Sequence, residues 1–231
     1  YARSKRAKPF KLDGRADLIG AITDWLDQGW SPKLIALVLR VIFFQPFTIP
    51  SESMEPALLK GDYIIVSKYS YGYSKHSIPF SPPLFKGRIF ASAPKRGDII
   101  VFRYPIDIRQ TFVKRVIGVP GDEVAYLNKQ LTINGQPVAK AARTDFFEQD
   151  SLRYIAQFEE KLPLGSKPSE MSDVRTHNVL NDKERPSFIP GADDFAFKEN
   201  CHYTVEGITC KVPAGHYFMM GDNRDNSLDS R

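Results

Sequence analysis

The longest apolar run of the chain covers residues 34–44 and is interrupted only by Arg40. Ser31 followed by Pro32 is a typical helix start and Pro46 a typical stop, so the pattern predicts one helix over residues 32–47. Such a helix of about 15 residues is roughly 22 Å long, shorter than the roughly 30 Å hydrocarbon core of a bilayer. Because the run is apolar on every face, we interpret it as a transmembrane helix in which Arg40 must snorkel or find a partner. A helix buried in a protein core is the alternative.

Upstream of this run, residues 16–28 have the spacing of an amphipathic helix. Five apolar residues share one face, whereas Asp17, Asp24 and Asp27 lie elsewhere: Leu18, Ile19, Ile22, Trp25 and Leu26. The spacing does not separate a helix on a membrane surface from one that packs against another helix.

Basic residues also precede the run: Arg3, Lys5, Arg6, Lys8, Lys11, Arg15 and Lys33. This excess is typical of the cytoplasmic flank of a membrane span. We therefore expect residues 1–31 to form a cytoplasmic basic and amphipathic segment, with residues from 50 onward outside.

After residue 50 the pattern becomes that of short strands. Residues 63–66, 98–102, 111–113, 116–119 and 217–220 are β-branched or aromatic and are bounded by Gly, Pro or Asp. Residues 131–138 predict a hairpin because Asn134-Gly135 suits its turn. No long helical pattern interrupts these segments, so this part should be mostly β. Residues 69–93 read as an extended loop or ribbon, and residues 139–200 are polar and poorly periodic, with no derivable fold.

The composition indicates a folded protein and argues against nucleic-acid binding and a metal site. The 231 residues are 42% hydrophobic and 26% charged, which suits a folded protein with one sizeable core or two small ones. The net charge of +5 is mild, and no basic stripe, helix-turn-helix pattern or zinc spacing points to a nucleic-acid partner. The histidines are scattered and no Cys-x-x-Cys occurs, so no metal site is expected. Cys201 and Cys210 could be two buried thiols or a disulfide across a hairpin.

Three segments carry candidate chemistry. Residues 50–56 read Pro-Ser-Glu-Ser-Met-Glu-Pro, and residues 112–122 read Phe-Val-Lys-Arg-Val-Ile-Gly-Val-Pro-Gly-Asp. Residues 221–231, Gly-Asp-Asn-Arg-Asp-Asn-Ser-Leu-Asp-Ser-Arg, crowd small and charged side chains together, as a tight turn with fixed hydrogen bonds requires. In this order the segments resemble the bacterial type I signal peptidases, membrane-bound serine proteases with a Ser-Lys dyad. The resemblance covers roughly residues 37–231, interrupted over 139–200.

The resemblance implies roles for individual residues. Ser53 would be the nucleophile and Lys114 the general base, on an apolar strand where desolvation lowers the pKa of a lysine. The backbone N–H of Ser53 and the hydroxyl of Ser51 would form the oxyanion hole, and Ser227 would orient the lysine. Glu52 replaces a glycine that some members carry and adds a negative charge near the site.

Three further groups of residues follow from the same resemblance. One group would support the structure around the site: Asp229, Arg231 and Arg115. An ordinary cluster of salt bridges would give the same pattern of residues. A second group would line small substrate pockets that accept Ala-like side chains: Phe47, Ile49, Pro50, Met54, Leu58, Phe112 and Val113. Packing in the hydrophobic core is an equally good interpretation of these residues. The usual periplasmic placement of the family favours the disulfide between Cys201 and Cys210.

The expected fold is a signal-peptidase-like β catalytic core over residues 48–138 and 201–231, with residues 139–200 as a variable inserted subdomain. An amphipathic helix and a membrane-anchoring helix precede it. The resemblance also implies an earlier membrane helix and a further C-terminal strand beyond the given residues.

The expected function is that of a membrane-anchored serine endopeptidase. It would cleave signal peptides from exported preproteins after Ala-x-Ala-type sites, through an acyl-enzyme and without a cofactor. Its place would be the bacterial inner (cytoplasmic) membrane, with the catalytic domain on the periplasmic side beside the secretion translocon.

Two alternatives remain. A self-cleaving repressor-type Ser-Lys peptidase is disfavoured by the apolar run and by the absence of a helix-turn-helix pattern. A non-catalytic, membrane-tethered peptide-binding module would not explain Ser53, Lys114 and Ser227 together.

Overall fold

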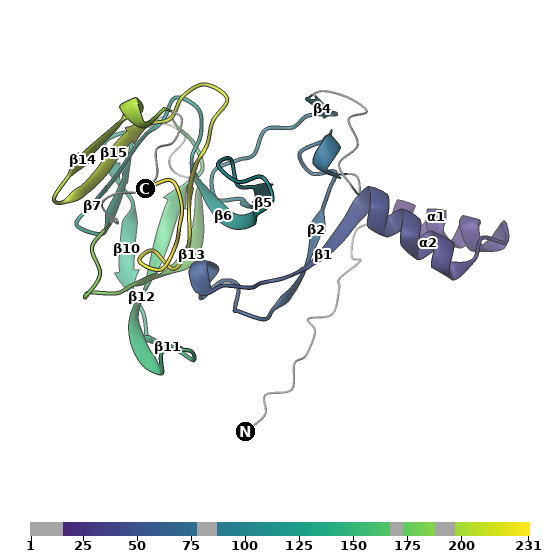
Figure 1. Cartoon of the computed structure of the whole chain (residues 1–231), viewed down its shortest axis with the longest axis horizontal. Helices are drawn as coiled ribbons and strands as arrows, with labels where there is room; N and C mark the ends of the chain where they lie inside the picture. The colour runs from purple at the N-terminus through teal and green to yellow at the C-terminus, as the bar shows by residue number, and fades with distance from the viewer. Residues whose placement is uncertain (1–15, 78–86, 167–172, 188–196) are drawn as a thin grey trace. The chain divides into compact units, whose positions relative to one another are not determined.

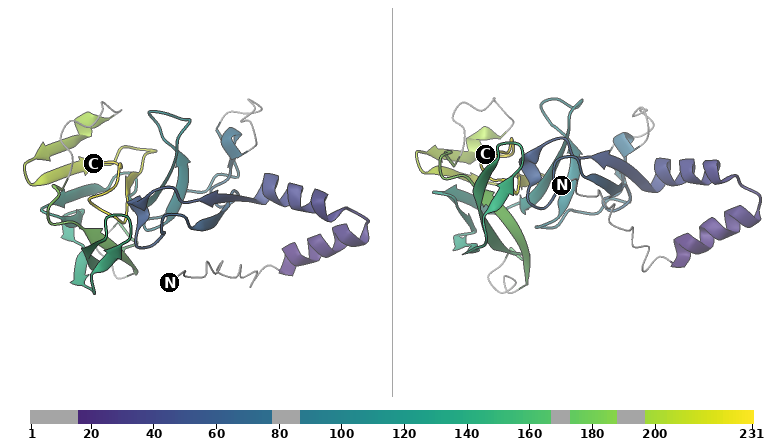
Figure 2. Two further views of the ribbon diagram at one scale, coloured as in Figure 1. Left: turned by 60° about the horizontal axis from the view of Figure 1, so that its bottom comes forward. Right: turned by 90° about the horizontal axis from the view of Figure 1, so that it is seen from below.

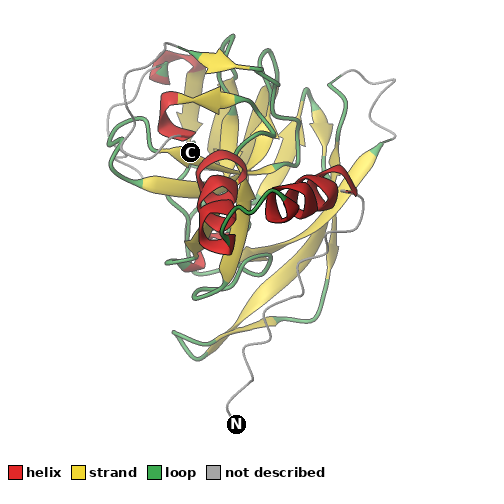
Figure 3. Cartoon of the chain, turned by 90° about the vertical axis from the view of Figure 1, so that its right-hand side faces the viewer, coloured by secondary structure: helices red, strands yellow, loops and turns green. Residues whose placement is uncertain are grey.

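The computed structural model describes residues 16–77, 87–166, 173–187 and 197–231. Strands dominate these residues and the helices are short (Figure 3), so the prediction of a mostly β fold is confirmed. The chain divides into two compact units, one formed by Tyr1–Thr48 with Tyr63–Ala93 and the other by Ile49–Asp62 with Pro94–Arg231.

The first unit begins with two consecutive helices joined by a tight turn (Figure 2). The expected amphipathic helix is present as α1, Ala16–Asp27. Beyond it Gly29 adopts a φ of +83°, and the rings of Trp25 and Trp30 stack with centroids 5.6 Å apart. Helix α2, Pro32–Val38, begins as expected, because the side chain of Ser31 accepts the backbone N–H of Leu34.

The prediction of one helix over residues 32–47 is wrong at its C-terminal end. Helix α2 continues as the π-helical turn η1, Leu39–Phe43, and the chain then extends as strand β1, Phe44–Thr48. Pro46 explains the change, because its ring would clash inside a helix and it biases Gln45 toward an extended backbone. Within the described residues, no helix combines the length and apolarity needed to cross a membrane.

The rest of the first unit is built from two antiparallel pairs. Strand β1 pairs with β2, Tyr63–Ser67, so the strand predicted at residues 63–66 is present. Strand β3, Tyr73–Ser74, is followed by the 3₁₀ turn η3, Lys75–Ser77, and pairs with β4, Arg88–Ile89. These pieces fit the ribbon expected over residues 69–93, of which residues 78–86 lie outside the described chain.

The second unit contains a three-stranded sheet that carries the candidate base. Strand β6, Thr111–Gly118, lies between β5, Ile99–Arg103, and β16, Phe218–Met220. The segments predicted as two strands, 111–113 and 116–119, therefore form one continuous strand, and Lys114 lies near its middle.

A five-stranded sheet lies in the same unit, in which β14, β15 and β7 run side by side (Figure 1). The predicted hairpin is formed, and Asn134 and Gly135 adopt positive φ values of 50° and 77° at its turn. In sheet order the strands are β14, Cys201–Thr204; β15, Gly207–Lys211; β7, Glu123–Leu127; β8, Gln130–Ile133; and β9, Gln136–Pro137. The 3₁₀ turn η5, Lys198–Asn200, leads into β14.

Residues 139–200, whose fold the pattern left open, contain a further sheet around the long strand β12, Arg153–Pro163 (Figure 1). Strand β12 pairs with β10, Ala139–Ala142, with β11, Phe146–Glu148, and with β13, Val174–Asn181. Its described residues belong to the same compact unit as β6.

Strands from all three sheets supply one hydrophobic core. Its fully buried members include Ile117, Tyr126, Leu131, Leu162, Ile208 and Met220. Cys201 and Cys210 occupy paired positions of β14 and β15 at the edge of this core and are joined as a disulfide. The core fixes the position of β6 and β16 and, with them, the residues described next.

Candidate active site

Ser53 lies on a single 3₁₀ turn, η2, Glu52–Met54. Ser51 before it is extended, and Met54 after it is only 1% exposed, so burial of its side chain anchors the turn. The hydroxyl oxygens of Ser51 and Ser53 are 3.4 Å apart. The turn thus presents two hydroxyls next to each other.

Lys114 reaches this turn from β6. Its side chain is buried, and Nζ donates to Ser53 Oγ at 2.6 Å. The ring of Phe112, two residues along the same strand, lies 5.5 Å from Nζ. The predicted neighbours Ser53 and Lys114 are therefore in direct contact, although 61 residues separate them.

Burial lowers the pKa of Lys114 to about 8. The carboxylates of Asp229 and Asp222 act in the opposite direction, whereas Arg231 lowers the pKa further. Because desolvation disfavours the ammonium form, a much larger fraction of this lysine is neutral near pH 7 than of an exposed lysine. A neutral amine can accept a proton from the serine hydroxyl.

The final loop, residues 221–231, contacts the turn that carries Ser53. The N–H of Asn223 donates to the carbonyl of Ser53 at 3.2 Å. At Gly221 an added Cβ would lie 2.4 Å from both the Ser53 carbonyl oxygen and Ser227 Oγ, so only glycine fits this approach. The loop and the nucleophile turn are in backbone contact.

Ser227 lies beside this contact. Its hydroxyl is buried and has no partner in hydrogen-bond geometry among the described residues, although it is near enough to Asp229 to help lower the pKa of that carboxyl. The bond from Ser227 to Lys114 that the resemblance implies is not formed in this structure.

The expected supports take part in two buried ion pairs. Arg115 donates to both carboxylate oxygens of Asp222, at 2.8 and 2.7 Å, and so joins β6 to the final loop. Arg231 donates to both oxygens of Asp229 at 2.9 Å, within the loop. Burial alone would raise the pKa of Asp229, but the Arg231 guanidinium holds it below its usual value.

The sequence that forms this site matches a known protein family. The family model described as signal peptidase, peptidase S26, matches residues 22–231. The chain belongs to this family. It is therefore a hydrolase of the serine peptidase type.

Several curated relatives are similar over most of the chain. Signal peptidase I of Rickettsia typhi is 40% identical over 199 residues, which is 85% of this chain and 68% of that protein. Signal peptidase I of Rickettsia akari is also 40% identical over 199 residues, with 85% and 67% covered. That of Rickettsia prowazekii is 39% identical over the same length, with 85% and 68% covered.

The residues expected to line signal peptidase pockets differ in burial. Ile49 and Met54 are only 3% and 1% exposed, so they pack as core side chains. Phe112 is half-buried and stacks on Tyr104 with ring centroids 4.4 Å apart. Leu58 and Val113 are also half-buried, Pro50 is exposed, and Phe47 is half-buried on β1 in the other unit.

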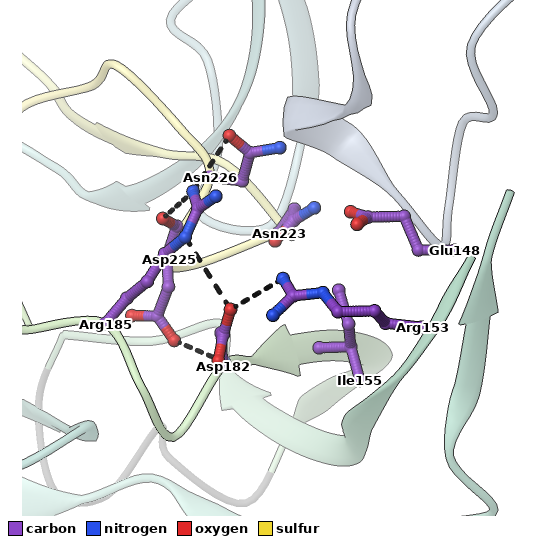
Figure 4. Close-up of a pocket in the computed structure, with 8 residues that line it drawn as sticks. All are labelled: Glu148, Arg153, Ile155, Asp182, Arg185, Asn223, Asp225 and Asn226. Carbon is purple, nitrogen blue, oxygen red and sulfur yellow. Dashed lines mark hydrogen bonds and ion pairs between the residues drawn. The ribbon is translucent and has the colours of Figure 1, made fainter. Parts of the chain in front are cut away.

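A small pocket with mostly polar lining residues is formed in part by the final loop (Figure 4). It is lined by Glu148, Arg153, Ile155, Asp182, Arg185, Asn223, Asp225 and Asn226. No residue expected to bind substrate lines it. In the described part of the chain, no three His, Cys, Asp or Glu side chains come together as a metal site would require.

Sequence reasoning missed two acidic residues that tie the final loop to neighbouring strands. Asp222, which holds Arg115, lies within the motif but was not singled out. Glu160 on β12 pairs with Arg224 at 3.1 and 2.5 Å, and it comes from the region whose fold could not be derived from the sequence. No local signal marks Glu160, because its partner lies 64 residues further along the chain.

Proposed function

We propose that this protein is a signal peptidase that removes signal peptides from exported preproteins, with Ser53 as nucleophile and Lys114 as general base. The observation that carries the proposal is the 2.6 Å contact between Lys114 Nζ and Ser53 Oγ. A buried lysine whose pKa is lowered to about 8 suits a base that must lose its proton near neutral pH.

The reaction proceeds in two halves. Neutral Lys114 takes the proton of Ser53 as Oγ attacks the scissile carbonyl carbon, and the resulting ammonium then protonates the departing amine of the mature protein. The carbonyl carbon is left as an ester on Ser53. A water molecule gives its proton to Lys114 and attacks this ester, which releases the signal peptide and returns a proton to Ser53.

Two groups would stabilise the oxyanion of each tetrahedral intermediate, namely the N–H of Ser53 and the hydroxyl of Ser51. The 3.4 Å separation of the Ser51 and Ser53 hydroxyls supports this role, because a donor must lie close to the attacked carbon. Ser227 would orient Lys114 once its buried hydroxyl, which has no hydrogen-bond partner among the described residues, turns toward the amine.

Substrate choice would depend on the apolar residues around η2 and β6. Leu58, Phe112 and Val113 are half-buried, so each keeps surface for an Ala-like side chain before the cut. Small residues at the first and third positions before the cut are the expected preference.

The proposed setting is the bacterial inner membrane, with the catalytic unit on the periplasmic side near the translocon. Leu34, Leu37 and Ile42 of α2 and η1 are 44%, 56% and 42% exposed. Apolar side chains left exposed on one helical segment support contact with lipid.

Cleavage of a preprotein with an Ala-x-Ala site by the detergent-solubilised chain tests the proposal. We expect specific cleavage after that site, and loss of it in Ser53→Ala and Lys114→Ala. Two exposed residues provide matched controls, Ser70→Ala and Lys211→Ala, which should keep full activity. Turnover by purified Ser53→Ala close to that of its control would refute the assignment.

A further inference from the structure

Glu160 is a buried acid in the C-terminal half of β12. It is 1% exposed and lies opposite Lys140 on β10 and His177 on β13, so strands hold its backbone on both sides. None of the three motifs that identify the family includes it. A carboxylate placed this deeply needs a charged partner.

The partner is Arg224 of the final loop. The guanidinium donates to Oε1 at 3.1 Å and to Oε2 at 2.5 Å, and neither side chain is more than 1% exposed. Burial alone would lower the pKa of Arg224, but Glu160 raises it above its usual value, so the arginine stays charged. Two parallel bonds fix orientation as well as distance.

His177 does not compete for Glu160. Its Nε2 is 3.6 Å from Oε2, but burial, with Arg115 and Arg224 nearby, lowers the pKa of His177 to about 2. The imidazole is therefore neutral at working pH. Arg224 remains the charged group in bidentate contact with Glu160.

Arg224 in turn sets the backbone of the final loop. Its N–H donates to the carbonyl of Leu180 at 3.0 Å, and its carbonyl accepts from Arg231. Arg231 holds Asp229, whose Oδ2 accepts the N–H of Gly221 at 3.1 Å. A continuous series of contacts thus connects Glu160 to the glycine that abuts the Ser53 carbonyl.

A second, shorter connection passes through Asn223. This residue precedes Arg224, and its N–H donates to the Ser53 carbonyl at 3.2 Å. If Arg224 moved, the Asn223 peptide would move with it. Both connections end on the nucleophile turn.

Neighbouring side chains of the loop are held separately. Figure 4 shows Asp225 and Asn226 facing Arg185, which donates to the Asp225 carbonyl at 3.1 Å and to Asn226 Oδ1 at 3.2 Å. Arg185 is exposed in part, whereas Glu160 and Arg224 are not. A buried bidentate pair restricts the loop more than a solvated one does.

We propose that Glu160 is a positioning residue for the peptidase reaction, holding Arg224 so that the final loop keeps the Ser53 turn in register with Lys114. This rests on the proposed function, because its effect is measured on cleavage of a preprotein. Glu160 touches neither Ser53 nor Lys114, so it acts through Arg224.

The test compares two neighbouring glutamates of β12. Glu160→Gln removes the buried charge, and Glu159→Gln removes the charge of the half-exposed neighbour, which bonds Arg143 on the opposite face. We expect kcat for preprotein cleavage to fall by roughly 10- to 100-fold in Glu160→Gln with little change in KM, because small misplacements of reacting groups are costly. Glu159→Gln should retain the wild-type kcat.

Temperature separates positioning from stability. A variant that is merely less stable recovers full kcat at 10 °C, where its folded fraction is restored, whereas misplaced groups stay misplaced. A kcat for folded Glu160→Gln equal to that of Glu159→Gln at 10 °C would therefore overturn the proposal.

If Glu160→Gln does not fold, Glu160→Asp provides the measurement. It keeps the charge but withdraws the carboxylate by one methylene, so kcat should lie between the wild-type value and that of a Ser53→Ala blank. Wild-type kcat in folded Glu160→Asp would count against positioning. Failure of the proposed function would look different, because wild-type protein itself would not cleave.

Discussion

At the scale of single residues, the protonation of Lys114 decides when the enzyme works. Burial lowers its pKa to about 8, and only the neutral amine can accept the serine proton. We expect kcat/KM to rise with pH through an acid limb centred near 8 and to be low below it. A pH–rate profile with a substrate that does not titrate in this range measures the limb.

Other bases would place that limb elsewhere. A carboxylate would give a limb near pH 4 and an unperturbed histidine one near 6.5, as their ordinary pKa values of about 4 and 6.5 dictate. An arginine side chain stays protonated at any usable pH, so the Lys114→Arg variant should be inactive over the whole pH range measured. Activity that is constant from pH 6 to 9 would exclude Lys114 as the base.

Gly221 makes a second residue-level prediction. A Cβ there would lie 2.4 Å from the Ser53 carbonyl oxygen, so Gly221→Ala must push the nucleophile turn and the final loop apart. We expect kcat to fall by roughly 10²-fold, the cost of displacing reacting groups by about 1 Å. Gly20→Ala is the control, since Gly20 has nothing within 4 Å of the added atom. Equal kcat in the two variants would show that the close approach does not matter.

The sequence predicted some of these residue contacts better than others. Ser53 and Lys114 were expected to meet, and they do, because each lies in a motif of recognisable composition. The pairing of Arg115 with Asp222 was not foreseen, since an arginine beside two acidic residues of one loop has two plausible partners. Strand register decides between them, and register is a property of the folded sheets.

At the scale of elements, polar residues within strands limited what could be predicted. Lys114 and Arg115 interrupt the apolar pattern of β6, so one strand read as two. The same applies to β12 and β13, where the buried polar residues Glu160 and His177 break the periodicity, so that no fold could be derived for this region. The prediction of a helix over residues 32–47 is wrong for a different reason. It treats Pro46 as the residue at which the helix ends, but a proline also disfavours helical backbone in the residue before it, so the helix ends earlier.

His177 on β13 provides a prediction about the stability of this sheet. Its pKa is lowered to about 2 in the folded protein by burial and by Arg115 and Arg224, against about 6.5 when unfolded. Between these values the unfolded chain binds a proton that the folded protein excludes, so stability falls as the pH falls below about 6.5. The slope contributed is up to about 1.4 kcal/mol per pH unit.

Urea unfolding at pH 7, 6 and 5 measures this contribution. His177→Gln carries no titrating group, so its free energy of unfolding should fall less steeply with decreasing pH than that of the wild-type protein. The Glu160 and Asp222 carboxylates, 3.6 and 4.0 Å from Nε2, are present in both proteins and cancel in the comparison. Parallel curves would mean that His177 binds a proton in the folded protein as readily as in the unfolded chain.

At the scale of the whole molecule, the proposed topology places residues 1–33 in the cytoplasm and residues from 50 onward outside. Single cysteines at Lys5 and Leu152, in a background with Cys201 and Cys210 replaced by serine, report each side. Leu152 is 73% exposed, so a membrane-impermeant thiol reagent reaches it freely. We expect labelling of Leu152→Cys from outside intact cells and of Lys5→Cys only after permeabilisation. Labelling of both from one side would contradict the topology.

The hydrogen bond from the Asn223 N–H to the Ser53 carbonyl also makes hydrogen exchange of the Asn223 amide a measure of how the final loop separates from the serine turn. That amide cannot exchange its hydrogen with solvent until the final loop separates from the turn that carries Ser53. When the contact re-forms faster than the open amide exchanges, its rate of deuterium uptake reports the fraction of resting molecules in which this contact is open. A bound peptide inhibitor that needs the assembled centre should slow this one amide more than the amides of the surrounding strands.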